Sequence, residues 1–422
     1  MKVCVIGAGS TYTPELVEGF INRRDELPVS SISLMDIDGA KLDIVGTLAK
    51  RMVEKAGLGA TVELTTDRRK AIEGADYIIT QIRVGGLQAR IRDERIPIEF
   101  GVVGQETTGP GGFAKALRTI PVILSIARDI EKLAPDAWLI NFTNPSGIIT
   151  ETLLRHSKVK AIGLCNAPIG MWKNIAAKLE VEREKVFLKY VGLNHLSWIT
   201  QVFVGGRDVT QEVVKKGMAG RAKEDAAWMK EYGMIPNGYL HYYYARDKVV
   251  EDQKKAEKTR GEIVAEIEAD LLEQYKDANL QEKPKLLEKR GGANYSTAAV
   301  SLASAIHNNK NELHIVNVRN CGTITCLPYD SAIEAMSLVD SCGAHPLAIG
   351  DVPLEIRGLL HAVKAYEELA VKAGVEGDRT AALQALVAHP LIPSFTVAKG
   401  LLDRILEANA EYLPQFGRRR KG

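Results

Sequence analysis

A thiol and an imidazole stand in this sequence at places that suit a metal ion. Cys165 ends the apolar run 161–164 shortly before Pro168, which favours a helix start, and His195 follows Gly192 in a similar setting further along. A thiolate and a neutral imidazole are common ligands of divalent cations. Each residue alone is also typical of a protein core. The pair therefore predicts half of a metal site, supported by the motifs around it.

The beginning of the chain carries a glycine pattern typical of dinucleotide binding. The apolar run 2–6 ends at Gly7 and Gly9, ahead of a helical pattern. Gly7 permits a tight turn, and Gly9 lets backbone amides approach a pyrophosphate at the helix N-terminus. Tyr12 replaces the usual third glycine, so these residues alone also fit an ordinary turn. Asp36 ends the next strand pattern, where an acid binds ribose hydroxyls and disfavours a 2′-phosphate, so we expect NAD rather than NADP.

Alternating strand and helix patterns predict the frame that positions these residues. The patterns follow one another over residues 31–35, 61–64, 68–72, 77–82, 114–133 and 138–141. Such alternation is typical of a parallel, doubly wound sheet with right-handed crossovers, which binds ligands at the carboxyl ends of its strands. Arg83, Asn144 and Cys165 all follow strand patterns. We therefore expect them together at one edge of a Rossmann-like sheet.

A glycine-rich stretch over residues 101–112 separates two of these strands. Loops of this length in a compact domain are usually functional or disordered. Because Glu106 stands there among glycines and hydroxyl side chains, we expect a long loop that faces the substrate.

The sequence changes character after Gly170. Strand patterns at 186–191 and 197–204 predict an antiparallel pair, and amphipathic helices follow later. A chain of 422 residues also exceeds what one core usually fills. We predict an α/β protein with an NAD-binding domain over residues 1–166. An α+β domain for substrate, metal and oligomerisation follows over residues 167–422.

Composition and charge exclude several classes of protein. A hydrophobic content of 45% with 26% charged residues describes an ordinary globular chain. The formal net charge is +2, and we expect the basic cluster 418–421 to be a solvated end, so no nucleic-acid partner is expected. No apolar run approaches the roughly 18 residues of a membrane span, so no membrane partner is expected. Five scattered cysteines and a start without a signal peptide predict a reducing, cytoplasmic location.

Several further motifs are more specific than the glycine turn. They are Val103-Gly104-Gln105-Glu106-Thr107, Asn141-Phe142-Thr143-Asn144-Pro145, Cys165-Asn166-Ala167-Pro168, Gly192-Leu193-Asn194-His195 and Tyr239-Leu240-His241-Tyr242-Tyr243. Together with the replacement of the third glycine by a polar turn, they resemble glycoside hydrolase family 4, the NAD- and metal-dependent glycosidases. The similarity covers most of the chain and is densest before residue 260. This family departs from the usual hydrolysis by two carboxylates.

The resemblance implies the metal, the base and the cofactor contacts. Cys165 and His195 fall on positions that ligate a divalent cation, usually Mn²⁺, with sugar hydroxyls completing the shell. Tyr239 falls on the catalytic base, although Tyr242 and Tyr243 lie close enough in sequence to compete for that role. The expected NAD contacts are Gly7, Gly9, Ser10, Thr11, Asp36 and Arg83.

The resemblance also implies a substrate site. Arg90, Asn144 and Arg260 fall on positions that hold a 6-phosphate or nearby hydroxyls, and Glu106 is expected to face the same substrate. Asn166, which we also count as catalytic, resembles the 6-phospho-β-glucosidase branch of the family, since the α-specific branch has an acid there. The implied substrate is a phosphorylated disaccharide or β-glucoside.

The activity implied by the resemblance is hydrolysis of 6-phospho-β-glucosides to glucose 6-phosphate and an aglycone. C3 of the sugar is oxidised by NAD, the C2 proton is removed, the C1 group is eliminated, and water adds before the hydride returns. The metal stabilises the enediolate as a Lewis acid, and a nearby dication favours a tyrosinate base. The implied architecture is similar to lactate and malate dehydrogenases, associated as a homodimer or homotetramer.

Two other functions remain open at the level of sequence. An NAD-dependent hydroxy-acid dehydrogenase would share the fold, but it needs a His and Arg pair with an acid that orients the His, and we find no such set. A non-catalytic NAD-sensing protein would show no metal-dependent turnover of a substrate. Accumulation of NADH would identify the first, and metal-dependent turnover would exclude the second.

Overall fold

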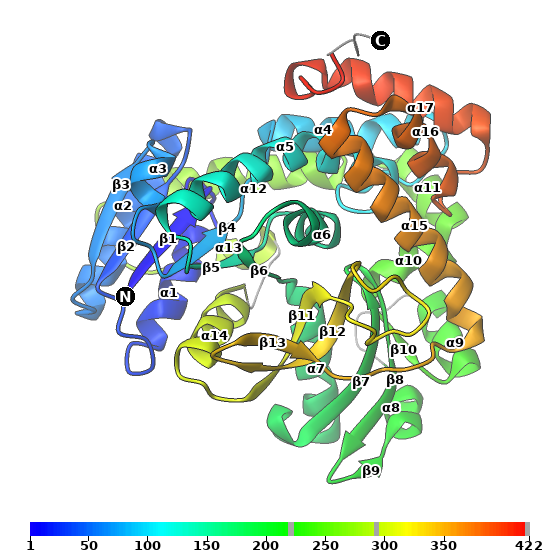
Figure 1. Cartoon of the computed structure of the whole chain (residues 1–422), viewed down its shortest axis with the longest axis horizontal. Helices are drawn as coiled ribbons and strands as arrows, with labels where there is room; N and C mark the ends of the chain where they lie inside the picture. The colour runs from blue at the N-terminus through cyan, green and yellow to red at the C-terminus, as the bar shows by residue number, and fades with distance from the viewer. Residues whose placement is uncertain (218–222, 291–294, 418–422) are drawn as a thin grey trace.

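The computed structural model describes residues 1–217, 223–290 and 295–417 (Figure 1). The basic cluster 418–421, expected to be a solvated end, lies outside the described residues. Among the helices that are described, none is long and apolar enough to cross a membrane.

A nine-stranded sheet forms the frame of the molecule, in the order β13-β12-β11-β6-β5-β4-β1-β2-β3. Its strands β1 to β6 are parallel to their neighbours, and β11, β12 and β13 continue the sheet in antiparallel fashion beyond β6. The strands are β1 (Lys2–Ile6), β2 (Ser31–Met35), β3 (Thr61–Thr65), β4 (Tyr77–Thr80), β5 (Trp138–Asn141), β6 (Lys160–Gly163), β11 (Glu312–Arg319), β12 (Ala332–Asp340) and β13 (Gly343–Pro346).

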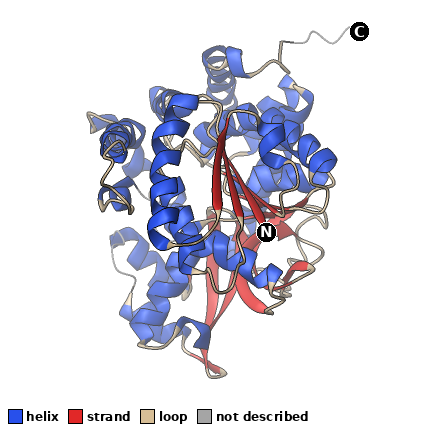
Figure 2. Cartoon of the chain, turned by 90° about the vertical axis from the view of Figure 1, so that its left-hand side faces the viewer, coloured by secondary structure: helices blue, strands red, loops and turns tan. Residues whose placement is uncertain are grey.

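Helices cover both faces of this sheet, and Figure 2 shows the strands between helical layers. The inner strands are buried almost throughout because both faces are covered, whereas β3 is partly exposed at the edge. Helix α1 packs on α2 and α14, and α5 packs on α3, α6 and α15. The helices of the first half are α1 (Thr13–Asn22), α2 (Gly39–Ala56), α3 (Arg68–Ile72), α4 (Gly86–Glu99), α5 (Gly109–Leu133), α6 (Ser146–His156) and α7 (Asn166–Leu179).

A smaller antiparallel sheet belongs to the second lobe, at the lower right of Figure 1. Its strands are β7 (Val186–Leu193), β8 (Leu196–Val204), β9 (Arg207–Asp208) and β10 (Ile235–Pro236). Around the two sheets lie α8 (Thr210–Lys216), α9 (Lys223–Tyr232), α10 (His241–Tyr244), α11 (Arg246–Lys255), α12 (Arg260–Tyr275), α13 (Leu286–Arg290), α14 (Tyr295–His307), α15 (Leu354–Glu376), α16 (Arg379–Ala388) and α17 (Phe395–Ala408). Short 3-10 turns are η1 (Arg183–Lys185), η2 (Gly238–Leu240) and η3 (Ala410–Tyr412).

The predicted α/β class and the parallel, doubly wound arrangement are confirmed by this sheet. The boundary between residues 166 and 167 stays a prediction, and β11 to β13, which lie after it in sequence, belong to the same sheet as β1 to β6.

The long loop expected over residues 101–112 is wrong at its end, because α5 already begins at Gly109. Its glycines serve close packing inside a helix. A Cβ atom on Gly111 would lie 2.3 Å from the carbonyl oxygen of Gln105, and one on Gly112 would lie 2.5 Å from the carbonyl carbon of Thr107. A Cβ atom on Gly111 would also lie 2.5 Å from the carbonyl oxygen of Asp93 on α4. Close contacts with the preceding segment and with α4 therefore require glycine in the first turn of α5, where the sequence pattern indicated a loop.

Candidate active site

Cys165 and His195 meet at the carboxyl end of β6. Cys165 follows that strand and precedes α7, and His195 lies in the tight turn between β7 and β8 with a φ of 64°. The Sγ atom of Cys165 is 3.4 Å from Nε2 of His195, and both side chains are buried. The structure thus brings together the thiol and the imidazole that the sequence placed 30 positions apart.

The spacing of this pair fits a shared metal ion. Ligands about 2.3 Å (sulfur) and about 2.1 Å (nitrogen) from a cation lie roughly 3.1 Å apart at a right angle and roughly 3.6 Å apart at a tetrahedral angle. The 3.4 Å separation falls between these values. Burial raises the pKa of Cys165 to about 12 and lowers that of His195 to about 3, so both groups are neutral in the metal-free protein. A sulfur and an imidazole nitrogen are ligands of first-row transition-metal dications, and oxygen ligands from a sugar would suit Mn²⁺ in the remaining positions.

Tyr239 lies flat on the ring of His195. The two ring centroids are 3.6 Å apart and the rings are inclined by only 5°. Tyr239 belongs to η2, whose start is fixed by Asn237, since the Asn237 side chain accepts a hydrogen bond from the Tyr239 amide. Burial raises the pKa of the Tyr239 phenol well above its usual range.

The competing tyrosines lie differently. The ring of Tyr242 is 6.1 Å from that of Tyr239 and tilted against it, while Tyr243 reaches His389, with 3.5 Å between its hydroxyl and Nε2. Of the three phenols, that of Tyr239 is the one stacked on the imidazole of His195.

Three cations converge on Glu106. It forms ion pairs with Arg83, with Arg90 at 3.0 Å and with Lys115 at 2.9 Å. Burial raises the pKa of Glu106, but the charges of Arg83, Lys115 and Arg90 outweigh this effect and hold the pKa well below its usual range. Arg90 also pairs with Glu94 at 2.8 Å, so the five side chains retain a net positive charge. This cluster suits an anionic substrate or cofactor.

Lys115 was missed in the sequence analysis. The signal was present, because Lys115 interrupts the otherwise apolar first turns of α5 and is only 3% exposed. Burial and the neighbouring Arg83 lower its pKa to about 8.

The glycine turn and Asp36 lie together as predicted for a dinucleotide loop. The Gly9 amide donates to Oδ2 of Asp36 at 2.8 Å, and Gly7 has a φ of 93°. A Cβ atom on Gly7 would meet the backbone of Gln81 at 2.9 Å, so only glycine fits there. Thr11 is fully buried, and its hydroxyl has no hydrogen-bond partner among the described residues. An unpaired donor at the start of α1 suits a phosphate oxygen.

The residues predicted to bind the substrate differ in their burial and in their hydrogen-bond partners. Asn144 follows β5, and its Oδ1 is buried without a hydrogen-bond partner in the described structure, which suits a sugar hydroxyl. Asn166 begins α7, with Oδ1 4.0 Å from Sγ of Cys165. Arg260 is exposed at the start of α12 and donates to the backbone carbonyls of Lys289 and Arg290. Its charge still reaches Tyr242, where it counteracts the rise in pKa caused by burial.

A buried carboxyl behind the thiol–imidazole pair was also missed. Glu334 on β12 accepts hydrogen bonds from Tyr190 at 2.6 Å, from Asn194 at 3.0 Å and from Asn317 at 3.3 Å. The Asn194 side chain also bonds to the thiol of Cys165. Burial raises the pKa of Glu334 to about 7. In the sequence, Glu334 could have been noticed as a lone acid inside an apolar strand pattern.

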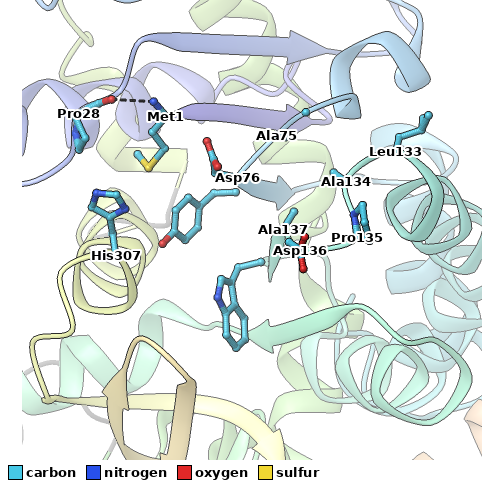
Figure 3. Close-up of a pocket in the computed structure, with 13 residues that line it drawn as sticks. Met1, Pro28, Ala75, Asp76, Leu133, Ala134, Pro135, Asp136, Ala137 and His307 are labelled. Atoms are coloured by element: carbon cyan, nitrogen blue, oxygen red, sulfur yellow. Dashed lines mark hydrogen bonds between the residues drawn. The ribbon is translucent and has the colours of Figure 1, made fainter.

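A cavity of about 630 Å³ lies at the opposite, amino edge of the strands (Figure 3). Its walls include Asp76, Tyr77, Trp138 and His307, which begin or precede strands or end a helix. None of the predicted site residues lines it. The chemistry-bearing side chains therefore lie at the carboxyl edge, where open α/β sheets bind ligands.

Fold and site together define an α/β protein of the dinucleotide-binding type with a buried thiol–imidazole pair. The profile described as "Family 4 glycosyl hydrolase" matches residues 2–181, and that of the "Family 4 glycosyl hydrolase C-terminal domain" matches residues 190–392. The chain belongs to family 4 of the glycosyl hydrolases, which confirms the resemblance found in the sequence.

Curated relatives match along the whole chain. A probable 6-phospho-beta-glucosidase of Bacillus subtilis (strain 168) is 50% identical over 432 residues, which cover 99% of this chain and 98% of the relative. The 6-phospho-beta-glucosidase of Escherichia coli (strain K12) is 40% identical over 437 residues, covering 99% and 97%.

Solved structures agree with the fold. The 6-phospho-beta glucosidase from Thermotoga maritima with manganese, NAD+ and glucose-6-phosphate has a TM-score of 0.91 and 40% identity, covering 98% of this chain and 99% of that one. The malate dehydrogenase of Plasmodium falciparum with NADH has a TM-score of 0.54 at 16% identity, covering 89% and 99%. The second likeness shows the dehydrogenase-like fold alone, as predicted.

Proposed function

We propose that this chain is an NAD- and divalent-metal-dependent 6-phospho-β-glucosidase that releases glucose 6-phosphate and an aglycone. The observation that carries the proposal is the stacking of Tyr239 on His195, 3.6 Å apart, with the Cys165 thiol 3.4 Å from the same imidazole. Relatives at 40 to 50% identity with this activity in their names support the substrate class. The glucose-6-phosphate complex of the Thermotoga maritima relative supports the 6-phosphate.

Cys165 and His195 would hold the dication, which supplies Lewis-acid stabilisation of negative charge at the sugar oxygens. The loop that would hold NAD is formed by Gly7, Gly9, Ser10, Thr11 and Asp36. NAD would supply a reversible two-electron oxidation at C3 of the sugar. Tyr239 removes the proton from C2 once the neighbouring carbon is a ketone, because oxidation makes that proton acidic. The C1 substituent then leaves, water adds at C1 of the resulting double bond, and C2 takes up a proton. The hydride finally returns to C3, which restores the alcohol and regenerates the oxidised cofactor.

The remaining residues position the sugar. Asn166 and the unpaired Oδ1 of Asn144 would accept hydrogen bonds from sugar hydroxyls, and the cation cluster around Glu106 provides the positive charge that a phosphorylated substrate requires. Arg90 and Arg260 are proposed to hold the 6-phosphate. Arg83 lies beside Glu106 and is proposed to face the cofactor.

We propose the cytoplasm as the location of the enzyme. Its five cysteines are free thiols, as in a reducing compartment. Residues 1–166 are proposed as the NAD-binding domain and residues 167–422 as the domain for substrate, metal and association into a homodimer or homotetramer.

The decisive assay uses p-nitrophenyl β-glucoside with and without a 6-phosphate. We expect turnover of the phosphorylated substrate only, lost on chelation and restored by Mn²⁺, with no net accumulation of NADH. Product formed in D₂O should carry deuterium at C2, because Tyr239 exchanges its proton with solvent. Equal turnover of both glucosides would refute the substrate, and NADH accumulating with turnover would indicate a dehydrogenase.

A further inference from the structure

The short segment that follows Val103 holds a chain of hydrogen bonds that ends on His195. Oε1 of Gln105 accepts from the backbone amide of Thr107 at 2.5 Å and from that of Thr108 at 2.7 Å. A backbone amide can only donate, so the side-chain atom that it meets is the carbonyl oxygen of Gln105. The orientation of this amide side chain is therefore fixed by its neighbours.

The Thr107 hydroxyl joins Gln105 to the imidazole. Its Oγ1 lies 2.9 Å from Oε1 of Gln105 and 3.1 Å from Nδ1 of His195. Because Oε1 can only accept, the hydroxyl hydrogen points to Gln105, and Oγ1 offers a lone pair to Nδ1. The hydrogen of the neutral imidazole must then reside on Nδ1, which leaves the lone pair of Nε2 facing Sγ of Cys165 at 3.4 Å.

We propose that Thr107 is a positioning residue that holds His195 in the Nδ1–H tautomer, with Nε2 free to bind the cation. The inference rests on the proposed metal site at Cys165 and His195. Thr107 lies 88 positions before His195 in the sequence, so it is the folded position of the segment after Val103 that fixes which ring nitrogen carries the hydrogen. Partners on the second nitrogen of a ligating histidine typically contribute 10- to 100-fold to metal affinity.

The neighbouring threonine provides a matched control. Thr108 is buried, whereas Thr107 is partly buried, and Oγ1 of Thr108 has no hydrogen-bond partner in the described structure, so Thr108→Val removes a hydroxyl without removing a bond. Thr107→Val has the same shape change and breaks the relay. Thr107→Ser keeps the hydroxyl and should therefore keep the hydrogen bonds to Gln105 and His195.

The first measurement is Mn²⁺ affinity, from the electron paramagnetic resonance signal of the free ion. We expect Thr107→Val to raise the dissociation constant by roughly 10- to 100-fold, with Thr107→Ser and Thr108→Val close to the unsubstituted protein. Equal losses for Thr107→Val and Thr108→Val would overturn the proposal. Cys165→Ser tests the metal site separately from the role of Thr107. If this variant leaves Mn²⁺ binding unchanged, the metal site itself is misplaced.

The second measurement needs no substitution of Thr107. In metal-free, ¹⁵N-labelled protein, long-range nitrogen–proton correlation distinguishes the two imidazole tautomers, and His195→Gln identifies the His195 signals among those of the eight histidines. We expect a protonated Nδ1 and an unprotonated Nε2. A signal from His195 with hydrogen on Nε2 would overturn the proposal even if Thr107→Val failed to fold.

Discussion

The imidazole of His195 is contacted on three sides, by the Cys165 thiol at Nε2, by the Thr107 hydroxyl at Nδ1 and by the phenol ring of Tyr239 on its face. Burial alone raises the pKa of Tyr239, which would make it a poor base. A dication on the stacked imidazole has the opposite effect, because positive charge favours the phenolate. The geometry thus ties the strength of the base to the presence of the metal.

Removal of the Tyr239 hydroxyl tests this assignment at the scale of one residue. Tyr239→Phe keeps the ring on His195, so we expect Mn²⁺ and NAD affinities to stay unchanged while kcat falls by roughly 10²- to 10⁴-fold. Steady-state kinetics with the phosphorylated glucoside and equilibrium binding measure the two effects. Tyr242→Phe is the comparison, and the base is misassigned if that variant is the inactive one.

Motifs sufficed for some site residues and not for others. Cys165 and His195 could be predicted because each follows a strand pattern within a motif that resembles the family, and the structure brings the two side chains together. Lys115 and Glu334 could not, because each has a site role only through contacts made after folding, with Glu106 and with Asn194. Arg260 was inferred from its motif, and its exposed place at the start of α12 gives that role less support than Arg90 receives.

At the scale of elements, a buried ion cluster joins α6, α15 and β12. Lys364 bonds to Glu151 at 2.7 Å, to Glu367 at 2.6 Å and to the Ala332 carbonyl at 2.8 Å. Burial raises the pKa of Glu367 to about 7, with Glu151 adding to the effect and Lys364 opposing it. The Arg155 guanidinium also pairs with Glu151, at 3.1 Å, so Glu151 has two cationic partners, and the carboxyl with the raised pKa is that of Glu367.

This raised pKa predicts how stability depends on pH. Between the unfolded pKa of about 4.5 and the folded value of about 7, the folded protein holds a proton that the unfolded chain lacks. The contribution of Glu367 is therefore fully present below this window, falls as pH rises through it and is constant above it. The shift corresponds to at most about 3 kcal/mol of unfolding free energy.

Urea unfolding at pH 5 and pH 8 measures this contribution. Glu367→Gln should lose less stability than the unsubstituted protein between the two pH values. Glu334, whose pKa is similarly raised, is present in both proteins and makes its own contribution to the pH dependence of their stability. Glu355→Gln, at an exposed position in the first turn of α15, is the control and should follow the unsubstituted protein. An unchanged pH dependence in Glu367→Gln would contradict the assignment.

Most elements of the first sheet could be predicted from local pattern, and the strand limits 31–35 and 138–141 agree with the structure. Two features depend on distant contacts instead. The start of α5 at Gly109 contains glycines that pattern assigns to loops, and β11 joins β6 through a pairing of Asn317 with Gly163. Neither contact leaves a trace in the local sequence.

At the scale of the whole molecule, helices from the second half of the chain reach back to the nucleotide loop. The Tyr275 hydroxyl at the end of α12 donates to the Thr11 carbonyl at 2.8 Å, and Arg51 on α2 donates to the carbonyls of Tyr275 and Leu280. The start of α1 is therefore held by the second half of the chain as well as by its own sheet.

We expect NAD binding to stabilise α12 as well as α1. Hydrogen exchange followed by mass spectrometry should show slower exchange in both helices with NAD present. Tyr275→Phe, which leaves the Thr11 carbonyl without this donor, should cost about 1 kcal/mol of stability and weaken NAD binding. Tyr232→Phe, at an exposed tyrosine, is the control. Protection confined to α1 would mean that the Tyr275 contact does not couple the two regions.

The pairing of β6 with β11 also has a consequence for folding during synthesis on the ribosome. After β6 is synthesised, roughly 150 residues must follow before β11 exists, which takes about 10 to 30 s at typical translation rates. During that interval the nascent sheet ends in an open strand edge, a template for pairing with other chains. The N-terminal half of this protein should therefore be a chaperone client while it is being translated, and chains released before Glu312 should aggregate.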